Sequence, residues 1–238
     1  SISGNEAALA AARAALAEGA ILAIRGIGGY HLACDARDEG AVARLRERKH
    51  RPTKPLAVMA PWAGGDGLAG ARALVDLDAV TAAALRDPLR PIVLCAKRAG
   101  APLAPGIAPG LAEIGLILPY SPLHHLLLGD HGRPLVMTSG NLSGEPVLTD
   151  AAEAARRLAG IADVFLDHDR PIVRPADDPV LRPIAGACRP IRLGRGLAPL
   201  TLPWPTPAGR PLLAVGGQQK ATVALAWGDR VVLSPHIG

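Results

Sequence analysis

The sequence predicts an α/β fold in which a twisted, mixed β-sheet is flanked by helices and followed by a short β-meander. Short apolar runs alternate with helical segments along most of the chain, which is typical of α/β domains. Hydrophobic residues make up 49% of the 238 residues and charged residues 20%, so apolar material for a core is ample. No apolar run approaches the ~18 residues of a membrane span, and the start lacks a signal-peptide pattern. We therefore expect a folded, cytoplasmic protein with no membrane partner.

Five elements are expected in the first 60 residues. The first helix is Ala-rich and Gly19 is its expected C-cap, whereas Pro52 and Pro55 stop the second helix. The elements are a helix at 5–18, strands at 20–26 and 26–36, a helix at 38–50 and a strand at 55–60.

The same alternation continues after residue 60. Ser121 is the expected N-cap of a helix with Pro122 in its first turn, and the Ala-, Pro- and Gly-rich stretch at 96–110 is expected to be a surface loop. The other elements are helices at 76–87 and 150–160 and β-like segments at 91–96, 115–119, 134–139, 162–166, 171–175, 179–184 and 188–194.

Three segments are expected along the chain: an α/β domain at 1–198, a Pro-rich linker at 199–211, and the truncated start of another domain at 212–238. Five prolines between Ala198 and Pro211 stiffen the chain and suit a linker. The final segment reads as three strands with turns at 216–219 and 227–229, a meander that is marginal by itself. Because the sequence starts with Ser1 rather than Met, we expect it to be part of a longer protein.

Positive charge is concentrated in one short segment. Residues 44–54 carry six basic residues and one acidic residue, so their net charge of +5 equals that of the whole chain. A general nucleic-acid binder more often spreads its charge and interleaves aromatic residues, which total only 3% here. Interaction with the helix dipole explains one or two of these charges. We therefore expect a local anion site, with a triphosphate as its natural occupant.

Lys49, Arg51 and Lys54 are the expected centre of that site. Pro52 forces extended geometry, which lets Lys49 and Arg51 point to the same side with Lys54 close by. Converging cations repel each other unless an anion neutralises them.

A second candidate follows the apolar run at 134–137. Thr138, Ser139, Asn141 and Ser143 lie at the carboxyl end of a predicted strand, where open α/β sheets bind ligands. Ser139 and Asn141 are suited to hold phosphate or ribose, although an ordinary Gly/Asn turn explains the same residues. Arg192 and Arg195 lie near glycines and are either a phosphate clamp or surface residues.

Other motifs give weaker signals. There is no P-loop pattern, no histidine spacing typical of a metal site and no CxxC pair, so Cys34, Cys95 and Cys188 are expected to be buried free thiols. Asp177 and Asp178 are candidates to bind the Mg²⁺ of a nucleotide, and a solvated turn is the alternative.

Six motifs, taken in order along residues 5–200, resemble the YrdC-like domain of the HypF carbamoyltransferases, which mature nickel–iron hydrogenases. These are GIGGYHLACDA, LRERKHRPTKPLAVM, IGLILPYSPLHHLLL, PLVMTSGNLSGEP, RPADDPVLRPI and IRLGRGLAP. The final run, GGQQKATVALAWGDRVVLSPHIG, resembles the start of that family's Kae1-like domain. The family's acylphosphatase and zinc-finger domains, and most of the Kae1-like domain, are outside this sequence and are expected partners.

The resemblance implies an enzyme that binds ATP, with its Mg²⁺, and forms carbamoyl-adenylate. It implies that the carbamoyl group comes from carbamoyl phosphate by way of carbamate and ends on the C-terminal cysteine of a HypE-like acceptor. By motif, Lys49 and Arg51 match the catalytic KxR residues. The nucleotide contacts are expected from Lys54, Thr138, Ser139, Asn141, Ser143, Arg192 and Arg195, and the carbamoyl pocket from Gly28, Gly29, Tyr30 and His31.

Two alternatives stay open from the sequence. The first is a threonylcarbamoyl-adenylate synthase for tRNA modification, although Met59 lies where such relatives tend to carry a histidine, which favours the smaller substrate. The second is a non-catalytic module that binds double-stranded RNA through its basic face.

Overall fold

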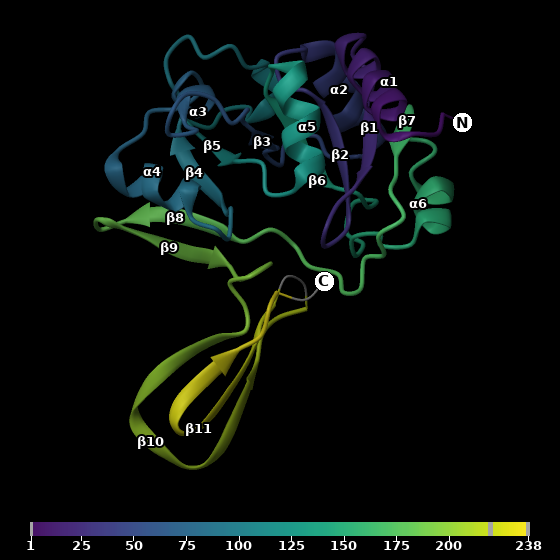
Figure 1. Cartoon of the computed structure of the whole chain (residues 1–238). Coiled ribbons are helices and arrows are strands. Elements are labelled where there is room, and N and C mark those ends of the chain that lie inside the picture. Colours follow the sequence, from purple (N-terminus) through teal and green to yellow (C-terminus); the bar gives the residue numbers. More distant parts are fainter. Residues whose placement is uncertain (1, 219–220, 237–238) are drawn as a thin grey trace.

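The structure, a computed structural model, describes residues 2–218 and 221–236. Nine strands form one sheet: β1 (Leu22–Arg25), β2 (Tyr30–Asp35), β3 (Ala57–Met59), β4 (Ile92–Ala96), β5 (Glu113–Ile117), β6 (Leu135–Ser139), β7 (Val164–Leu166), β8 (Val180–Ile184) and β9 (Ala187–Arg192). Their order across the sheet is β7-β1-β2-β6-β3-β5-β4-β8-β9, with both parallel and antiparallel pairs (Figure 1). The expected mixed α/β fold is confirmed.

Helices flank the sheet: α1 (Asn5–Ala17), α2 (Glu39–Arg48), α3 (Ala69–Arg72), α4 (Ala79–Arg86), the 3₁₀ turn η1 (Pro105–Ile107), α5 (Pro122–His131) and α6 (Ala151–Arg157). Four of them begin at a side chain that accepts a hydrogen bond from the first turn: Asp38, Asp78, Ser121 and Asp150. Within the described residues, no helix combines the length and the apolar character that a membrane crossing needs.

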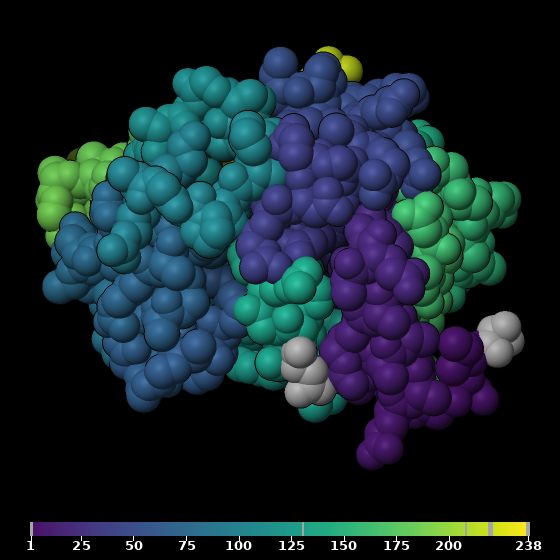
Figure 2. Space-filling view, turned by 90° about the horizontal axis from the view of Figure 1, so that it is seen from above, coloured from purple at the N-terminus to yellow at the C-terminus, as the bar shows by residue number. Residues whose placement is uncertain are grey.

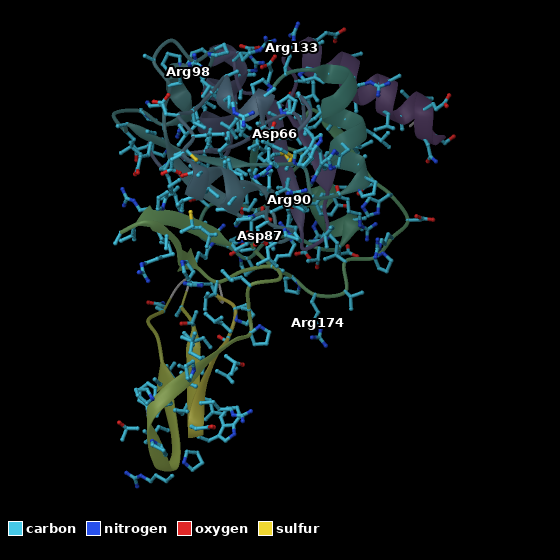
Figure 3. All side chains as sticks on the ribbon, turned by 60° about the vertical axis from the view of Figure 1, so that its left-hand side comes forward. Asp66, Asp87, Arg90, Arg98, Arg133 and Arg174 are labelled. Atoms are coloured by element: carbon cyan, nitrogen blue, oxygen red, sulfur yellow. The ribbon has the colours of Figure 1, made fainter. Side chains whose placement is uncertain are left out.

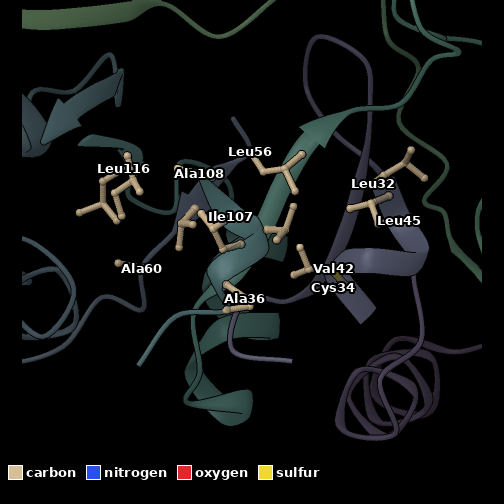
Figure 4. Packing of buried hydrophobic residues seen from close by; sticks show 14 of the residues in the cluster. Leu32, Cys34, Ala36, Val42, Leu45, Leu56, Ala60, Ile107, Ala108 and Leu116 are labelled. Atoms are coloured by element: carbon tan, nitrogen blue, oxygen red, sulfur yellow. The ribbon is translucent and has the colours of Figure 1, made fainter. Parts of the chain in front are cut away.

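The strands divide the core into two layers because successive side chains point to opposite faces of the sheet. Leu22 and Ile24 pack in the layer that contains α1 and α5, and Figure 2 shows α1 (purple) lying beside α5 (teal). The opposite layer contains α2, and Figure 4 shows Val42 and Leu45 of this helix near Leu32 of β2. Each face of the sheet is therefore covered by helices.

The register of the central strands brings two predicted site segments together. In the antiparallel pair of β2 and β6, His31 lies opposite Ser139. On the other edge of β6, Ala57 of β3 lies opposite Met137. The loop that precedes β3, which carries the predicted cations, is therefore placed next to the small-residue loop that follows β6.

A two-stranded ribbon, β10 (Leu200–Val215) and β11 (Val223–Leu233), projects from the sheet domain (Figures 1 and 3). Its end returns to the domain, because the Leu193 N–H donates to His236 Nδ1 at 2.8 Å and the His236 N–H donates to the Leu193 carbonyl at 2.9 Å. Figure 3 also shows Arg174, in the segment before β8, pointing away from the domain.

The structure differs from the expected elements in four places. Helix α3 was not expected, and residues 171–175 contain no strand. Most of the expected Pro-rich linker lies within β10, paired with β11. The residues of the expected turn at 227–229 lie inside β11, where Gly228 has a φ of 53° and the pairing with β10 is irregular. The turn expected at 216–219 lies partly outside the described residues. As expected, the three cysteines are free, with Cys34 and Cys95 buried and Cys188 partly buried.

The N-cap of α5 gives a first prediction. Ser121 Oγ accepts from the His124 N–H at 3.2 Å. We expect Ser121→Ala to lower the free energy of unfolding by about 1 kcal/mol because this N–H loses its acceptor. Urea unfolding followed by circular dichroism measures the change. Ser121→Asp keeps an acceptor and is the control, so equal destabilisation of both variants would contradict this role.

Candidate functional site

A cavity of about 390 Å³ lies where the loop after α2 meets the loop after β6. This volume is within the roughly 300–1,000 Å³ of small-molecule sites. Sheet residues such as Ile92, Leu94 and Met137 form an apolar floor. The polar and charged lining residues are His31, Lys49, His50, Arg51, Thr53, Lys54, Thr138, Ser139, Asn141, Ser143, Glu145, Asp177, Asp178 and Arg192.

Lys49 joins the two loops that form the cavity wall. It is the C-cap residue of α2 and is only 2% exposed. Its Nζ donates to the carbonyls of Ser139 and Asn141, each at 2.6 Å, and to Asn141 Oδ1 at 2.9 Å. Burial, together with the neighbouring Arg51 and Lys54, lowers the pKa of Lys49 from 10.5 to about 7. An anion in the cavity would therefore stabilise the charged form of this side chain.

The loop after β6 is held in one conformation by its own polar side chains. Ser139 Oγ donates to Asn141 Oδ1 at 2.8 Å, and Asn141 Nδ2 donates to the Glu145 carbonyl. Gly140 lies directly against β2, where a Cβ atom would be 2.5 Å from the Cβ of Tyr30. Only glycine fits there without a shift of the backbone. The loop is thus preformed rather than an open turn.

Four cations surround the cavity: Lys49, Arg51, Lys54 and Arg192. Burial and the proximity of Arg46 and Arg192 lower the pKa of Arg51 to about 10. The lowered pKa values of Lys49 and Arg51 mean that their surroundings disfavour positive charge as long as no anion is present. This electrostatic pattern is that of an anion site.

A partly buried ion-pair network lies at the other side of the cavity. Asp178 Oδ1 accepts from Arg195 Nη2 at 3.1 Å, and Asp178 Oδ2 lies 3.4 Å from His31 Nε2. The Arg195 guanidinium also stacks on the Tyr120 ring, 3.7 Å from its centroid. Burial raises the pKa of Asp178, but the partners His31 and Arg195 hold it well below its ordinary value. Both oxygens of this carboxylate are thus engaged within the protein.

The described residues offer no group of three or more His, Cys, Asp or Glu side chains that could hold a metal ion. Asp178, which the sequence left as a candidate for Mg²⁺, has its carboxylate committed to Arg195 and His31. The residues present therefore do not fit a Mg²⁺ ion held by Asp178.

Three of the six cations in residues 44–54 serve the fold instead of the cavity. Arg44 donates to the Gly19 carbonyl at 2.6 Å, and Arg48 forms an ion pair with Asp163 at 2.7 Å. Arg46 does not line the cavity itself, and its guanidinium donates to main-chain carbonyls of two loops. Only three of the six cations of the segment therefore line the cavity.

Most of the predicted site residues do lie together. Those that line the cavity are Gly29, His31, Lys49, Arg51, Lys54, Thr138, Ser139, Asn141, Ser143 and Arg192. Three others are placed elsewhere in the described structure: the Gly28 carbonyl accepts from the Ala176 N–H, Tyr30 donates to Asp167, and Arg195 serves the Asp178 network. Sequence reasoning missed the apolar floor, which carries no polar signal, and Glu145, which ends the GNLSGE motif.

Comparison with known proteins shows to which family this chain belongs. Residues 14–194 match the family model Sua5_yciO_yrdC, described as "Telomere recombination". The chain belongs to the Sua5/YciO/YrdC family. Residues 207–238 match the HypF Kae1-like domain, so the predicted resemblance of both segments is confirmed.

Individual relatives agree with this assignment. Carbamoyltransferase HypF of Synechocystis sp. is 46% identical over 222 residues, which cover 92% of this chain and 28% of that relative. Full-length HypF in its phosphate- and nucleotide-bound crystal form superposes with a TM-score of 0.88 at 43% identity, covering 98% of this chain and 36% of that chain. The threonylcarbamoyl-AMP synthase of Bacillus subtilis is 30% identical over 220 residues, which cover 83% of this chain and 61% of the relative. The chain thus spans about a third of the HypF proteins that it matches.

The turn that leads from α2 into the site carries a strained residue. The Arg51 N–H donates to the Arg46 carbonyl at 2.9 Å and the His50 N–H to the Glu47 carbonyl at 3.0 Å, which is a Schellman motif. His50 occupies its left-handed position with a φ of 51°, where glycine is usual.

We expect His50→Gly to raise the free energy of unfolding by about 0.5–1 kcal/mol. Glycine avoids a left-handed penalty of about 1–2 kcal/mol but loses more backbone entropy on folding. Urea unfolding measures the difference. The control His50→Ala keeps the strained backbone, so an equal gain in both variants would show that relief of strain is not the cause.

Proposed function

We propose that this chain binds ATP and forms carbamoyl-adenylate as part of a larger, cytoplasmic carbamoyltransferase of hydrogenase maturation. The observation that carries the proposal is the cavity itself, in which four cations face a preformed loop of hydroxyl and amide side chains. The similarity to HypF carbamoyltransferases and to a HypF structure in a nucleotide-bound form supports this assignment.

Charge neutralisation and positioning are sufficient for the proposed reaction. Carbamate is an anion, so its oxygen can attack the α-phosphorus of ATP without a general base. The new oxygen–phosphorus bond forms as the bond between the α-phosphorus and the bridging oxygen breaks, and pyrophosphate leaves. Fixed cations stabilise the charge that develops on the phosphate oxygens. No proton needs to be removed from the nucleophile.

The chain's residues divide these tasks between the two loops. Arg51 and Lys54 face the polyphosphate, and Lys49 adds its charge behind them while its three N–H donors fix the loop after β6. Ser139 and Asn141 hold the α-phosphate or the sugar, and the region of Gly29 and His31 receives the carbamoyl group. Mg²⁺ would enter with the nucleotide, because the described carboxylates form no ligand set for it.

The steps before and after adenylation belong to the larger protein. We propose that carbamate is derived from carbamoyl phosphate and that a HypE-like thiol is the final acceptor. Because the product is a reactive mixed anhydride, exclusion of water until transfer would be an advantage. Transfer is expected to require the acylphosphatase, zinc-finger and Kae1-like domains.

Threonylcarbamoyl-adenylate synthesis is the second candidate, favoured by the 30% identity to such a synthase. Pyrophosphate release from the purified chain separates the two reactions. With ATP, release that requires bicarbonate and L-threonine would support the second candidate, whereas release that requires carbamate and no L-threonine supports the proposal. Salt-sensitive RNA binding without nucleotide binding would instead indicate a non-catalytic module.

The double variant Lys49→Ala/Arg51→Ala tests the site assignment. We expect ATP affinity to fall by at least ~100-fold, or about 2.8 kcal/mol, because two of the cavity's cations are lost. Isothermal titration calorimetry measures the affinity, and circular dichroism checks the fold. Arg44→Ala/Arg48→Ala removes the same charge outside the cavity and should bind nearly normally. Unchanged ATP affinity in the first variant would refute the assignment.

The pKa of Lys49, about 7, predicts proton uptake on binding. A bound phosphate favours the ammonium form of Lys49 and raises its pKa. Above pH 7, ATP binding is therefore coupled to the uptake of a proton from solution by Lys49. We expect ATP affinity to fall between pH 7 and pH 9 by up to ~10-fold per pH unit. Calorimetry in buffers of different ionisation enthalpy counts the protons. An affinity and a proton count that stay constant over this range would contradict the mechanism.

A further inference from the structure

Arg46 lies on α2 only three residues before Lys49 but serves a different set of groups. It is 9% exposed and does not line the cavity in the described structure. The sequence motifs assign no role to Arg46. Its contacts nevertheless reach the segment from which two cavity cations project.

Five main-chain carbonyls accept hydrogen bonds from this one guanidinium. Its Nη1 donates to the carbonyls of Arg51, Pro52 and Lys54 at 2.7, 3.1 and 3.2 Å. On the other side, its Nε donates to the Gly106 carbonyl at 2.6 Å and its Nη2 to the Ile107 carbonyl at 3.3 Å. Arg46 thus binds two separate loops at once.

The first loop contains no regular secondary structure, and besides Arg46 the Arg51 side chain contacts its backbone, because Arg51 Nη2 donates to the Pro55 carbonyl at 2.7 Å. Residues 51–55 have no helix or strand, and Pro52 and Pro55 have no N–H group to donate. Three of the carbonyls in this loop turn inward to Arg46, so the side chains of Arg51 and Lys54 emerge on the side of the cavity. The path of this backbone therefore determines where the cations lie.

The second loop supplies a rigid support. Glu39, two turns earlier on α2, accepts from the Gly106 N–H at 2.8 Å. The Ile107 carbonyl also accepts from the Leu56 N–H at 2.9 Å, and Figure 4 shows Ile107 and Leu56 within the packed core. The 3₁₀ turn η1 is consequently held by α2 from both sides, and Arg46 ties the cation loop to it.

We propose that Arg46 is a positioning residue that sets the conformation of residues 51–54 and thereby directs Arg51 and Lys54 into the cavity. Its importance for ligand binding rests on the proposed nucleotide function, whereas its effect on the loop does not. Lysine cannot replace it, because a single ammonium offers three donors from one atom and cannot span carbonyls of two loops.

The variant Arg46→Lys tests this role, with Arg44→Lys as the matched control on the same helix. Arg44 donates to a single carbonyl, that of Gly19, outside the site. Hydrogen exchange should become at least ~10-fold faster in Arg46→Lys at the amides of Arg51 and Leu56, whose N–H groups donate to main-chain carbonyls at either end of the loop. Exchange in β2 and β6 should stay unchanged, as should both of these amides in Arg44→Lys. ATP affinity, measured by calorimetry, should fall at least ~10-fold in Arg46→Lys alone.

Each outcome decides the proposal. Unchanged exchange at the amides of Arg51 and Leu56 in a folded Arg46→Lys would overturn it, and so would faster loop exchange with wild-type ATP affinity. Global unfolding of Arg46→Lys would overturn it as well, since Arg46 would then support the whole fold rather than this loop. If the wild-type chain binds no ATP, the proposed function fails, while the exchange data still decide whether Arg46 orders the loop.

Discussion

The three hydrogen bonds of the Lys49 ammonium are the interaction on which the site depends. They join the end of α2 to the loop after β6, two segments separated by about ninety positions in the chain. The pairing of β2 with β6 brings these segments near each other, but only a long side chain can close the remaining gap. Since all three acceptors are uncharged oxygens, the bonds fix the loop without neutralising the positive charge.

The position of the site could be predicted from the sequence because its charge is local. Lys49, Arg51 and Lys54 lie within six residues, and Pro52 forces the chain there out of the helix. Helical geometry also explains why the other three cations are elsewhere. Arg44 and Arg48 are four residues apart and share one face of α2, whereas Arg46 lies on the opposite face. The helical positions of these arginines could be read from the sequence, but a count of charges does not show on which face of the helix each charge lies.

The Asp178 network could not be predicted in the same way. It joins side chains from β2, the start of α5 and two segments around β8 and β9, which no sequence spacing connects. Two adjacent aspartates look the same in a sequence whether they lie in a turn, bind a metal ion or form an ion pair. Only the tertiary contacts of Arg195 and His31 separate these cases.

The proline-rich residues of β10 form a strand, and a physical reason makes this hard to predict from composition. Proline is excluded from the middle of a sheet because it has no N–H for the ladder. In a two-stranded ribbon each strand has one open edge, so the N–H groups on that side need no partner strand. Register shifts on either side of Ala208 accommodate the rest. Composition alone therefore could not distinguish a stiff linker from an edge strand.

The use of carbonyl oxygens rather than carboxylates around the cations has a consequence at long range. Arg46 and Arg51 donate to main-chain oxygens, which do not cancel their positive charges, and Lys49 adds a further charge when it is protonated. Such a field extends beyond contact distance, concentrates dissolved polyanions near the entrance and speeds their capture. Dissolved salt weakens the attraction over a Debye length of about 8 Å at physiological ionic strength.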